Sequence, residues 1–289
     1  MISVVIATRN RAGALSRCLD ALARQAADGL AWEAVVVDNG STDATAAMID
    51  RFASGGALPL RRAFEPRPGV SAARNRGIAA ARHPVLAFTD DDCLPEPGWL
   101  AAIAVAFAAV PAPALVGGRV DLHDDADVPV AIRPFDMPAA IDGFDRVRSH
   151  LIGCNFVATR RLFDRIGGFD ETLGPGTWSR AGEDLELFCR AVHAGARIVF
   201  DPAVRVRHAH GRRDPGDVVG LGRSYTRGCG AVLGARIRAG QTTLWRPAYW
   251  EFRGLVAGAL RPGPDLPAPA AWRRVAEFGA AFAGRLIGG

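Results

Sequence analysis

The first half of the chain alternates short apolar runs with helical patterns, and this alternation constrains the fold more than any other feature. Four runs rich in apolar and β-branched residues are expected to form strands: residues 2–8, 33–38, 58–64 and 84–88. Helical spacing follows each of them, and helices are expected over residues 15–22, 44–52, 71–83 and 98–110. Continuous apolar strands separated by helices are typical of a parallel sheet that is covered on both faces. The sequence therefore predicts an α/β fold with a Rossmann-like, mostly parallel sheet.

The second half is less regular. Residues 121–150 mix acids, prolines and single aromatics, which indicates a long loop or insertion. An amphipathic helix is expected over residues 181–195, and two short strands over 196–210. From about residue 214 the chain becomes helical and rich in arginine, and a proline-rich joint at 262–270 precedes a final helix.

Composition excludes several classes of protein. The net charge of +5 favours acidic partners, but the arginines are not interleaved with aromatics in a stripe, so no nucleic-acid partner is expected. The five cysteines are odd in number and far apart, which argues against a disulfide framework and a zinc site. The chain starts directly with a strand pattern and contains no apolar run of membrane-spanning length, so a cytoplasmic location is expected.

Polar side chains cluster where the expected strands end. These positions are residues 8–10, 38–43 and 90–92, and ligands of open α/β sheets bind at the carboxyl ends of the strands. Three adjacent carboxylates, Asp90, Asp91 and Asp92, repel one another unless a cation neutralises them. Mg²⁺ or Mn²⁺ would suit these oxygen ligands and would also bind substrate phosphates. The alternative is that Asp91 and Asp92 cap the next turn or face solvent.

Six sequence motifs occur in a fixed order along the chain. They are SVVIATRNRAGAL, VVVDNGSTDAT, PGVSAARNRGIAAA, FTDDDCLPEPGWL, IGGFDETLG and GEDLELFCRAVHAG. With these motifs, residues 1–210 resemble the family 2 glycosyltransferases of the GT-A fold. The resemblance implies transfer of a sugar, with inversion, from a nucleotide-diphosphate sugar donor (a UDP- or dTDP-sugar) to an acceptor hydroxyl in bacterial glycan or glycoconjugate synthesis. The acceptor would be a glycan, a lipid-linked molecule or a small molecule.

The resemblance also divides the chain and assigns the donor site. Residues 1–212 would be the catalytic domain, with a nucleotide-sugar-binding half (1–120) and an acceptor-binding half (121–212), and residues 213–289 a helical C-terminal region. The residues implied at the nucleotide are Thr8, Arg9, Asp38, Asp43 and Arg74. Two of them have a purely structural alternative: Asp43 would cap a helix, and Arg74 would be a surface arginine.

The TDDD segment matches the DxD motif of the family. The match implies that Asp90 lies near the ribose, that Asp92 binds Mg²⁺ or Mn²⁺, and that Asp91, in the variable middle position, matters least. His208 matches a histidine that completes the metal shell in several relatives; the alternative is a structural histidine.

The acidic pair at the start of the helix near residue 183 matches the catalytic base of the family. Asp184 would be the general base, and Glu183 would steady the loop or the acceptor. Without the other motifs, such a pair would only be favourable charge at a helix N-terminus. Trp178 precedes the pair and would either stack on a sugar ring or anchor the loop.

The last helix carries an apolar stripe with arginines beside it. One reading is an interfacial helix on an anionic membrane, on the inner face of the plasma membrane; the other is packing against the catalytic domain or another subunit of an oligomer. Two alternatives to a glycosyltransferase remain. One is a catalytically idle sugar-nucleotide-binding subunit. The other is a nucleotidyltransferase, although its glycine-rich phosphate loop with a following lysine is absent.

Overall fold

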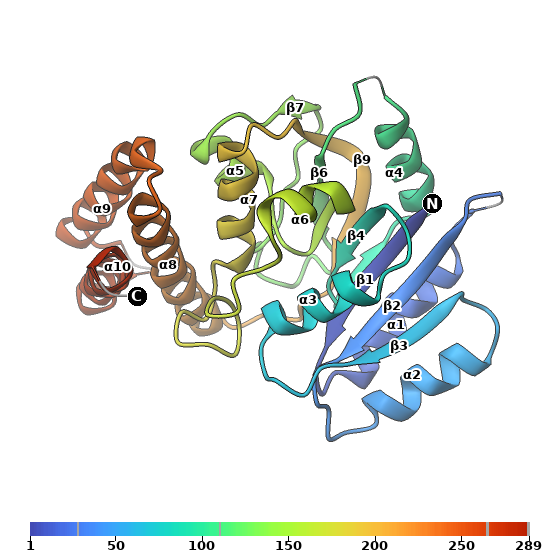
Figure 1. Ribbon diagram of the computed structural model, residues 1–289. Coiled ribbons are helices and arrows are strands. Elements are labelled where there is room, and N and C mark those ends of the chain that lie inside the picture. The colour runs from blue at the N-terminus through green and yellow to red at the C-terminus, as the bar shows by residue number, and fades with distance from the viewer. Residues whose placement is uncertain (28, 110, 264–265, 288–289) are drawn as a thin grey trace.

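A single mixed sheet forms the centre of the protein, in the strand order β3-β2-β1-β4-β8-β6-β9-β5 (Figure 1). The computed structural model describes residues 1–289 except 28, 110, 264–265 and 288–289. The four strands of the first half pair in parallel, with Thr8 opposite Asp38, so their carboxyl ends meet at one edge. They are β1(Ile2–Thr8), β2(Trp32–Asp38), β3(Leu60–Phe64) and β4(Val85–Thr89).

The strands of the second half pair in both directions. β8 lies antiparallel between β4 and β6, whereas β6 and β9 are parallel and β5 is antiparallel to β9. The predicted α/β fold is confirmed, with a wholly parallel first half and a mixed second half. These strands are β5(Cys93–Pro95), β6(Leu115–Leu122), β7(Ala139–Ala140), β8(Asn155–Thr159) and β9(Ile198–His208).

Two expectations for the second half are wrong. Residues 196–210 contain one long strand, β9, instead of two short ones, because the chain continues through an irregularity opposite Gly118 and Arg119. Residues 121–150 are not one loop, since they include the end of β6, the short strand β7 and a helix, α5(Phe144–His150).

Helices cover both faces of the sheet. Alternate residues of β1 enter opposite cores, with Val4 and Ile6 on one side and Val5 on the other. The first core includes Leu15 of α1, and the second includes Phe188 of α7. The helices of this part are α1(Ala12–Ala23), α2(Thr45–Ser54), α3(Val70–Ala80), α4(Trp99–Ala108), α6(Arg160–Ile166) and α7(Glu183–His193). The helix predicted over 98–110 is α4, and its expected last residue, 110, lies outside the described residues.

Three further helices stand together beside α7 (Figure 1): α8(Pro215–Arg238), α9(Trp245–Leu260) and α10(Ala268–Ile287), with a 3-10 turn, η1(Thr242–Leu244), before α9. A Cβ at Gly234 of α8 would lie 2.3 Å from the Phe282 carbonyl oxygen, so glycine allows α8 and α10 to approach closely. The apolar stripe of α10 packs on α8 with Phe278 at its centre, as the second reading of this helix expected. Residues 264–265 of the expected joint lie outside the described residues.

All five cysteines have free thiols and are buried: Cys18, Cys93, Cys154, Cys189 and Cys229. Among the helices that the structure describes, none has both the length and the apolar character needed to cross a bilayer.

Candidate active site

A cavity of about 840 Å³ opens at the carboxyl ends of β1 and β4 and extends to α7, α8 and α10. Nine of the residues predicted from the sequence line it, so most of the predicted site does come together. They are Thr8, Arg9, Arg74, Asp90, Asp91, Asp92, Glu183, Asp184 and His208.

Two members of the acidic cluster, Asp91 and Asp92, are buried and pair with Arg11, which sequence reasoning missed. Arg11 Nε lies 2.8 Å from Asp91 Oδ1, and its Nη2 lies 2.6 Å from Asp92 Oδ2. Thr8 Oγ1 donates to Asp91 Oδ2 at 2.7 Å. Burial raises the pKa of Asp91 to about 7, and Arg11 and Thr8 oppose that rise. The reading in which Asp91 and Asp92 face solvent is wrong, because both are less than a tenth exposed.

Asp92 and His208 form a pair that fits a divalent metal. The β5–β9 ladder places Cys93 opposite His208, and Asp92 Oδ1 lies 3.3 Å from His208 Nε2. Burial raises the pKa of Asp92, but the hydrogen bond and charge of His208, together with the charges of Arg11 and Arg212, outweigh it and hold the value at about 2. Burial lowers the pKa of His208, but the hydrogen bond with Asp92, together with the other negative charges nearby, outweighs it and brings the value to about 9.

The donors around this pair are an oxygen and a nitrogen and do not include a thiolate. His208 Nδ1 lies 3.2 Å from the Ala131 carbonyl oxygen, which leaves Nε2 free to ligate in the neutral ring. The Cys93 sulfur, the Asp92 carboxylate and the His208 ring nitrogen lie within 4.8 Å of one another. Burial raises the pKa of the Cys93 thiol well above its usual value, so the thiol stays protonated. The Asp92 carboxylate and the His208 imidazole remain as donors for a divalent metal.

Arg74 joins the two halves of the site. Its Nη2 lies 2.8 Å from Asp90 Oδ1, and its Nη1 lies 3.0 Å from Glu183 Oε1. The guanidinium also stacks over the Phe169 ring, 5.4 Å from its centroid. Burial lowers the pKa of Arg74, but the charges of Asp90 and Glu183 outweigh it and raise the value above normal. Arg74 is therefore a buried bridge, and its reading as a surface arginine is wrong.

The Glu183–Asp184 pair lies at the first turn of α7, as predicted. Asp184 Oδ2 accepts a hydrogen bond of 2.7 Å from the Gly153 amide, which fixes the carboxylate at the cavity wall. Burial raises the pKa of Glu183 to about 7, and the charge of Asp184 adds to the rise while Arg74 opposes it. Gly182 precedes the helix with φ +101°, and a Cβ there would lie 3.0 Å from the Gly228 carbonyl oxygen of α8. The start of α7 is thus packed tightly against α8.

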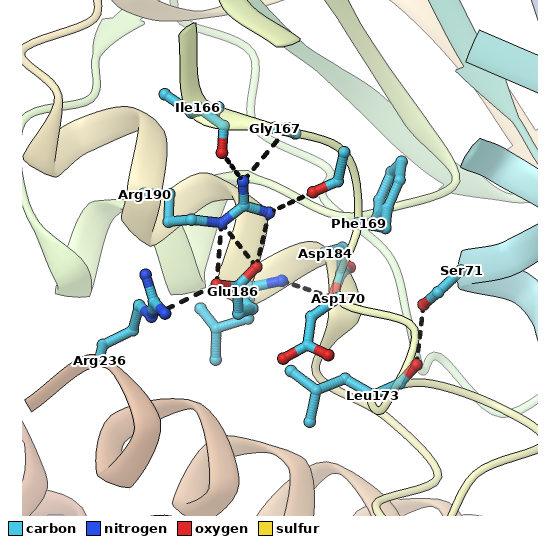
Figure 2. Close-up of polar contacts among 12 residues, drawn as sticks. Ser71, Ile166, Gly167, Phe169, Asp170, Leu173, Asp184, Glu186, Arg190 and Arg236 are labelled. Carbon is cyan, nitrogen blue, oxygen red and sulfur yellow. Dashed lines mark hydrogen bonds and ion pairs between the residues drawn. The ribbon is translucent and has the colours of Figure 1, made fainter. Parts of the chain in front are cut away.

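A network of charges holds α7 in place (Figure 2). Arg190 makes a two-point contact with the buried Glu186, with its Nη2 2.7 Å from Oε2. The same guanidinium donates to the carbonyl oxygens of Gly167 and Gly168, at 3.2 and 2.6 Å. Arg236 of α8 lies 3.3 Å from Glu186. The helix that carries Asp184 is therefore tied both to the loop after α6 and to α8.

Three predicted residues are not among the described residues that line the cavity: Asp38, Asp43 and Trp178. The Asp38 carboxylate is held by Arg62 Nη2 at 2.9 Å. Asp43 lies one residue before Ala44, which is the N-cap of α2, and its Oδ1 accepts from the Thr45 amide at 2.9 Å. Trp178 is half exposed. The nucleotide and sugar contacts of these three residues stay predictions.

The family model for glycosyl transferase family 2 matches residues 3–167. The chain belongs to this family. A pre-mycofactocin glycosyltransferase of Mycobacterium tuberculosis is 33% identical over 222 residues, which are 72% of this chain and 43% of that protein. A validoxylamine A glucosyltransferase of Streptomyces hygroscopicus is 34% identical over 67% of this chain and 51% of its own length. The chain thus spans about half the length of these curated relatives.

Solved structures share the fold of this family 2 member. A mannosyltransferase of Pyrobaculum calidifontis, in complex with GDP-Man and Mn²⁺, superposes with a TM-score of 0.66 at 22% identity and covers 99% of this chain and 87% of its own. S. aureus TarS 1–349 with UDP-GlcNAc gives a TM-score of 0.60 at 17% identity, over 98% of this chain and 90% of its own. These likenesses show that the fold is GT-A, including the helical C-terminal part.

Proposed function

We propose that this protein is an inverting glycosyltransferase that moves a sugar from a nucleotide-diphosphate sugar, a UDP- or dTDP-sugar, to an acceptor hydroxyl. The observation that carries the proposal is that the acidic cluster with Asp92 and the helix start with Asp184 border one cavity of about 840 Å³. A cavity of this size is within the range of small-molecule sites. The proposal divides the catalytic part, residues 1–212, into donor and acceptor halves at about residue 120.

The donor would lie over the ends of the parallel strands. Thr8 and Arg9 would contact the base and ribose together with Asp38, and Asp90 would bind the ribose. Asp43 would support the phosphate side, and Arg74 would orient Asp90 through their ion pair. Thr8, Arg9, Asp90 and Arg74 line the cavity, which supports their part of this assignment.

Asp92 and His208 would hold Mg²⁺ or Mn²⁺, because the Asp92 oxygen, in the turn before β5, and the His208 nitrogen, on β9, lie 3.3 Å apart. A bound divalent ion would neutralise the negative charge of the departing diphosphate. Arg11 already supplies positive charge to Asp91 and Asp92, so this chain holds a second cation at the same carboxylates.

Asp184 would take the proton from the acceptor hydroxyl as its oxygen attacks the anomeric carbon. The bond from that carbon to the diphosphate oxygen breaks on the opposite face, and the single displacement inverts the anomeric centre. The Gly153 amide holds one carboxylate oxygen of Asp184 in place during the transfer. Glu183 would steady the helix start through Arg74, and Trp178 would close over the acceptor or anchor its loop.

The expected peripheral contact with a membrane moves from α10 to α9. The apolar stripe of α10 packs on α8, whereas α9 exposes four aromatic side chains. Glu251 is the sole acid between residues 240 and 262, and it is paired with Arg148. We name this basic aromatic patch the α9 patch, and an anionic lipid surface complements it. The patch comprises Trp245, Arg246, Tyr249, Trp250, Phe252 and Arg253.

Incubation with a panel of UDP-, dTDP- and GDP-sugars and Mn²⁺, followed by measurement of released nucleotide, tests the proposal. We expect one donor to release its nucleoside diphosphate, slowly with water and faster with the correct acceptor hydroxyl. Binding of donors without any release would favour the catalytically idle subunit. Release of pyrophosphate from a nucleoside triphosphate and a sugar phosphate would favour the nucleotidyltransferase.

A further inference from the structure

The C-terminal helices form one end of the cavity. Leu221 and Tyr225 of α8, Leu255 of α9 and Phe278 of α10 line it with apolar surface. A second cavity of about 360 Å³ shares the lining residues Leu255 and Arg274 and is bordered by α9 and α10. The two spaces therefore adjoin and extend the site between the helices.

This apolar end contains positive charge that the described chain does not neutralise. Arg148 is paired with Glu251 at the boundary of the two cavities. Arg274 donates from Nε to Thr226 Oγ1 at 3.0 Å, and among the described residues no carboxylate lies within ion-pair distance of it. Burial lowers the pKa of Arg274, and the nearby charge of Arg148 adds to this effect.

The nearest acidic residue along α10 already forms ion pairs with other arginines. Glu277 follows Arg274 by one turn, but its carboxylate is bound by Arg223 and by Arg227 Nη2, the latter at 3.2 Å. Arg274 is thus a guanidinium that lines a cavity and has one hydroxyl partner from its Nε. Such a group is well suited to bind a carboxylate or phosphate, because its two remaining nitrogens form a planar fork.

We propose that this end of the cavity is the acceptor subsite and that it takes an amphiphilic acceptor whose anionic group pairs with Arg274. The apolar ring or chain of that acceptor lies against Leu221, Leu255 and Phe278. That the ligand is an acceptor rests on the proposed function; that an anionic amphiphile binds beside Arg274 does not. The tight packing of Gly182 against Gly228 places the start of α7, and with it Asp184, directly beside the helix that carries Leu221 and Tyr225.

Two fluorescent probes test the subsite without knowledge of the acceptor. 8-Anilinonaphthalene-1-sulfonate has an apolar body and one anionic group, and N-phenyl-1-naphthylamine has the same body without the charge. We expect Arg274→Gln to weaken binding of the sulfonate about 10-fold or more, as loss of a charge-assisted hydrogen bond does. Binding of the neutral probe should change less than about twofold. Arg274→Lys, which keeps the charge, should restore part of the lost affinity, and Arg273→Gln, the exposed neighbour, should have no effect.

Titration of UDP with Mn²⁺ on the same variants separates this inference from the proposed function. UDP should bind wild type and Arg274→Gln equally and should not displace the sulfonate. The subsite is refuted if the sulfonate binds Arg274→Gln as well as wild type, if both probes weaken equally, or if UDP displaces the sulfonate. Failure of wild type to bind any nucleotide would overturn the glycosyltransferase proposal while the probe result still decides the subsite.

Discussion

Asp184 and Glu183 are neighbours of the same charge, but their surroundings differ. Glu183 is buried and faces Arg74 at 3.0 Å, and burial raises its pKa to about 7. Asp184 is partly exposed and lines the cavity, and its two oxygens accept hydrogen bonds of 2.7 Å from the backbone amides of Gly153 and Leu185 and from no side chain. A base must reach the acceptor proton, and Asp184 meets this condition better than Glu183 does.

Asp184→Asn should therefore lower turnover by about 10²- to 10⁴-fold, the usual cost of losing a general base. The affinity for the donor should barely change, because the donor leaves without that proton. Rates of nucleotide release and a donor titration measure the two quantities. Asp164→Asn, an exposed acid on α6, is the matched control, and Glu183→Gln should be milder than Asp184→Asn. Near-normal turnover of Asp184→Asn, or a product that keeps the donor's anomeric configuration, would contradict the assignment.

Arg11 occupies the carboxylate oxygens to which a metal would bind. Arg11→Gln should increase the affinity for Mn²⁺ in the absence of nucleotide by about 10-fold, because a guanidinium roughly 5 Å from a divalent ion repels it even in a water-like dielectric. Paramagnetic resonance of free Mn²⁺ measures this affinity. Arg17→Gln, an exposed arginine on α1, should leave it unchanged. An Arg11→Gln protein that bound Mn²⁺ more weakly would show that Arg11 supports the metal site.

For single residues, the sequence predicts which side chains gather at the site but not which of them form ion pairs. Asp90–Asp92 and Asp184 could be found because acids at a strand end and at a helix start stand out in the chain. Arg11 was missed, although a basic residue three positions after Thr8 faces the acidic cluster. Arg74 was found, but its partner Glu183 lies 109 residues away in the sequence, so their contact depends on the folded packing.

α7 is held by contacts outside itself. Arg190, which is partly buried, lies between Glu186 and the carbonyl oxygens of the loop after α6 (Figure 2). Arg190→Met would leave Glu186 with Arg236 alone and the carbonyls without their donor.

We expect Arg190→Met to lower the free energy of unfolding by about 3 kcal/mol, the scale of breaking one side of a buried ion pair. Urea unfolding measures it. Arg161→Met, an exposed arginine on α6, should cost less than about 0.5 kcal/mol, as surface substitutions do. Equal stability of the two variants would show that the network in Figure 2 contributes nothing beyond local contacts.

β1, β2 and β4 were predictable because each is buried on both faces and therefore reads as a continuous apolar run, whereas the edge strand β3 buries only Leu60. β9 was expected as two strands because Asp201 and Pro202 interrupt its pattern. In the structure Pro202 lies where the β6–β9 register shifts, and a proline is tolerated at such an irregularity because no ladder bond is needed there. β8 is only five residues long and continues directly into α6, so no turn residue marks its end in the sequence.

On the scale of the whole molecule, the C-terminal helices belong to the site as well as to the fold. The sequence predicted that they are helical, and it left open whether the last helix packs inward or meets a membrane. That choice depends on the face that α8 offers, where glycines at residues 230 and 234 admit the backbone of α10. Such a fit between two helices cannot be read from either of them alone.

The α9 patch should bind vesicles that contain anionic lipid, and less well as salt is added, because arginines and aromatics act together at such surfaces. Trp250→Ser should reduce the bound fraction severalfold in a sedimentation assay by removing one interfacial aromatic. Phe64→Ser, at an exposed aromatic of β3, is the control for loss of apolar surface elsewhere. Equal binding to neutral vesicles, or no difference between the two variants, would contradict a role for the patch.

The buried thiols can report how often each part of the protein opens. Cys18 lies in the core beneath the parallel strands, whereas Cys189 and Cys229 lie where α7 meets the C-terminal helices. A thiol reagent reaches each sulfur only while the surrounding packing is open, so its rate reports the free energy of that opening. Fast labelling of Cys229 with slow labelling of Cys18 would mean that the C-terminal helices breathe while the sheet stays closed. Acceptors would then enter the cavity between the C-terminal helices, by a route separate from that of the donor.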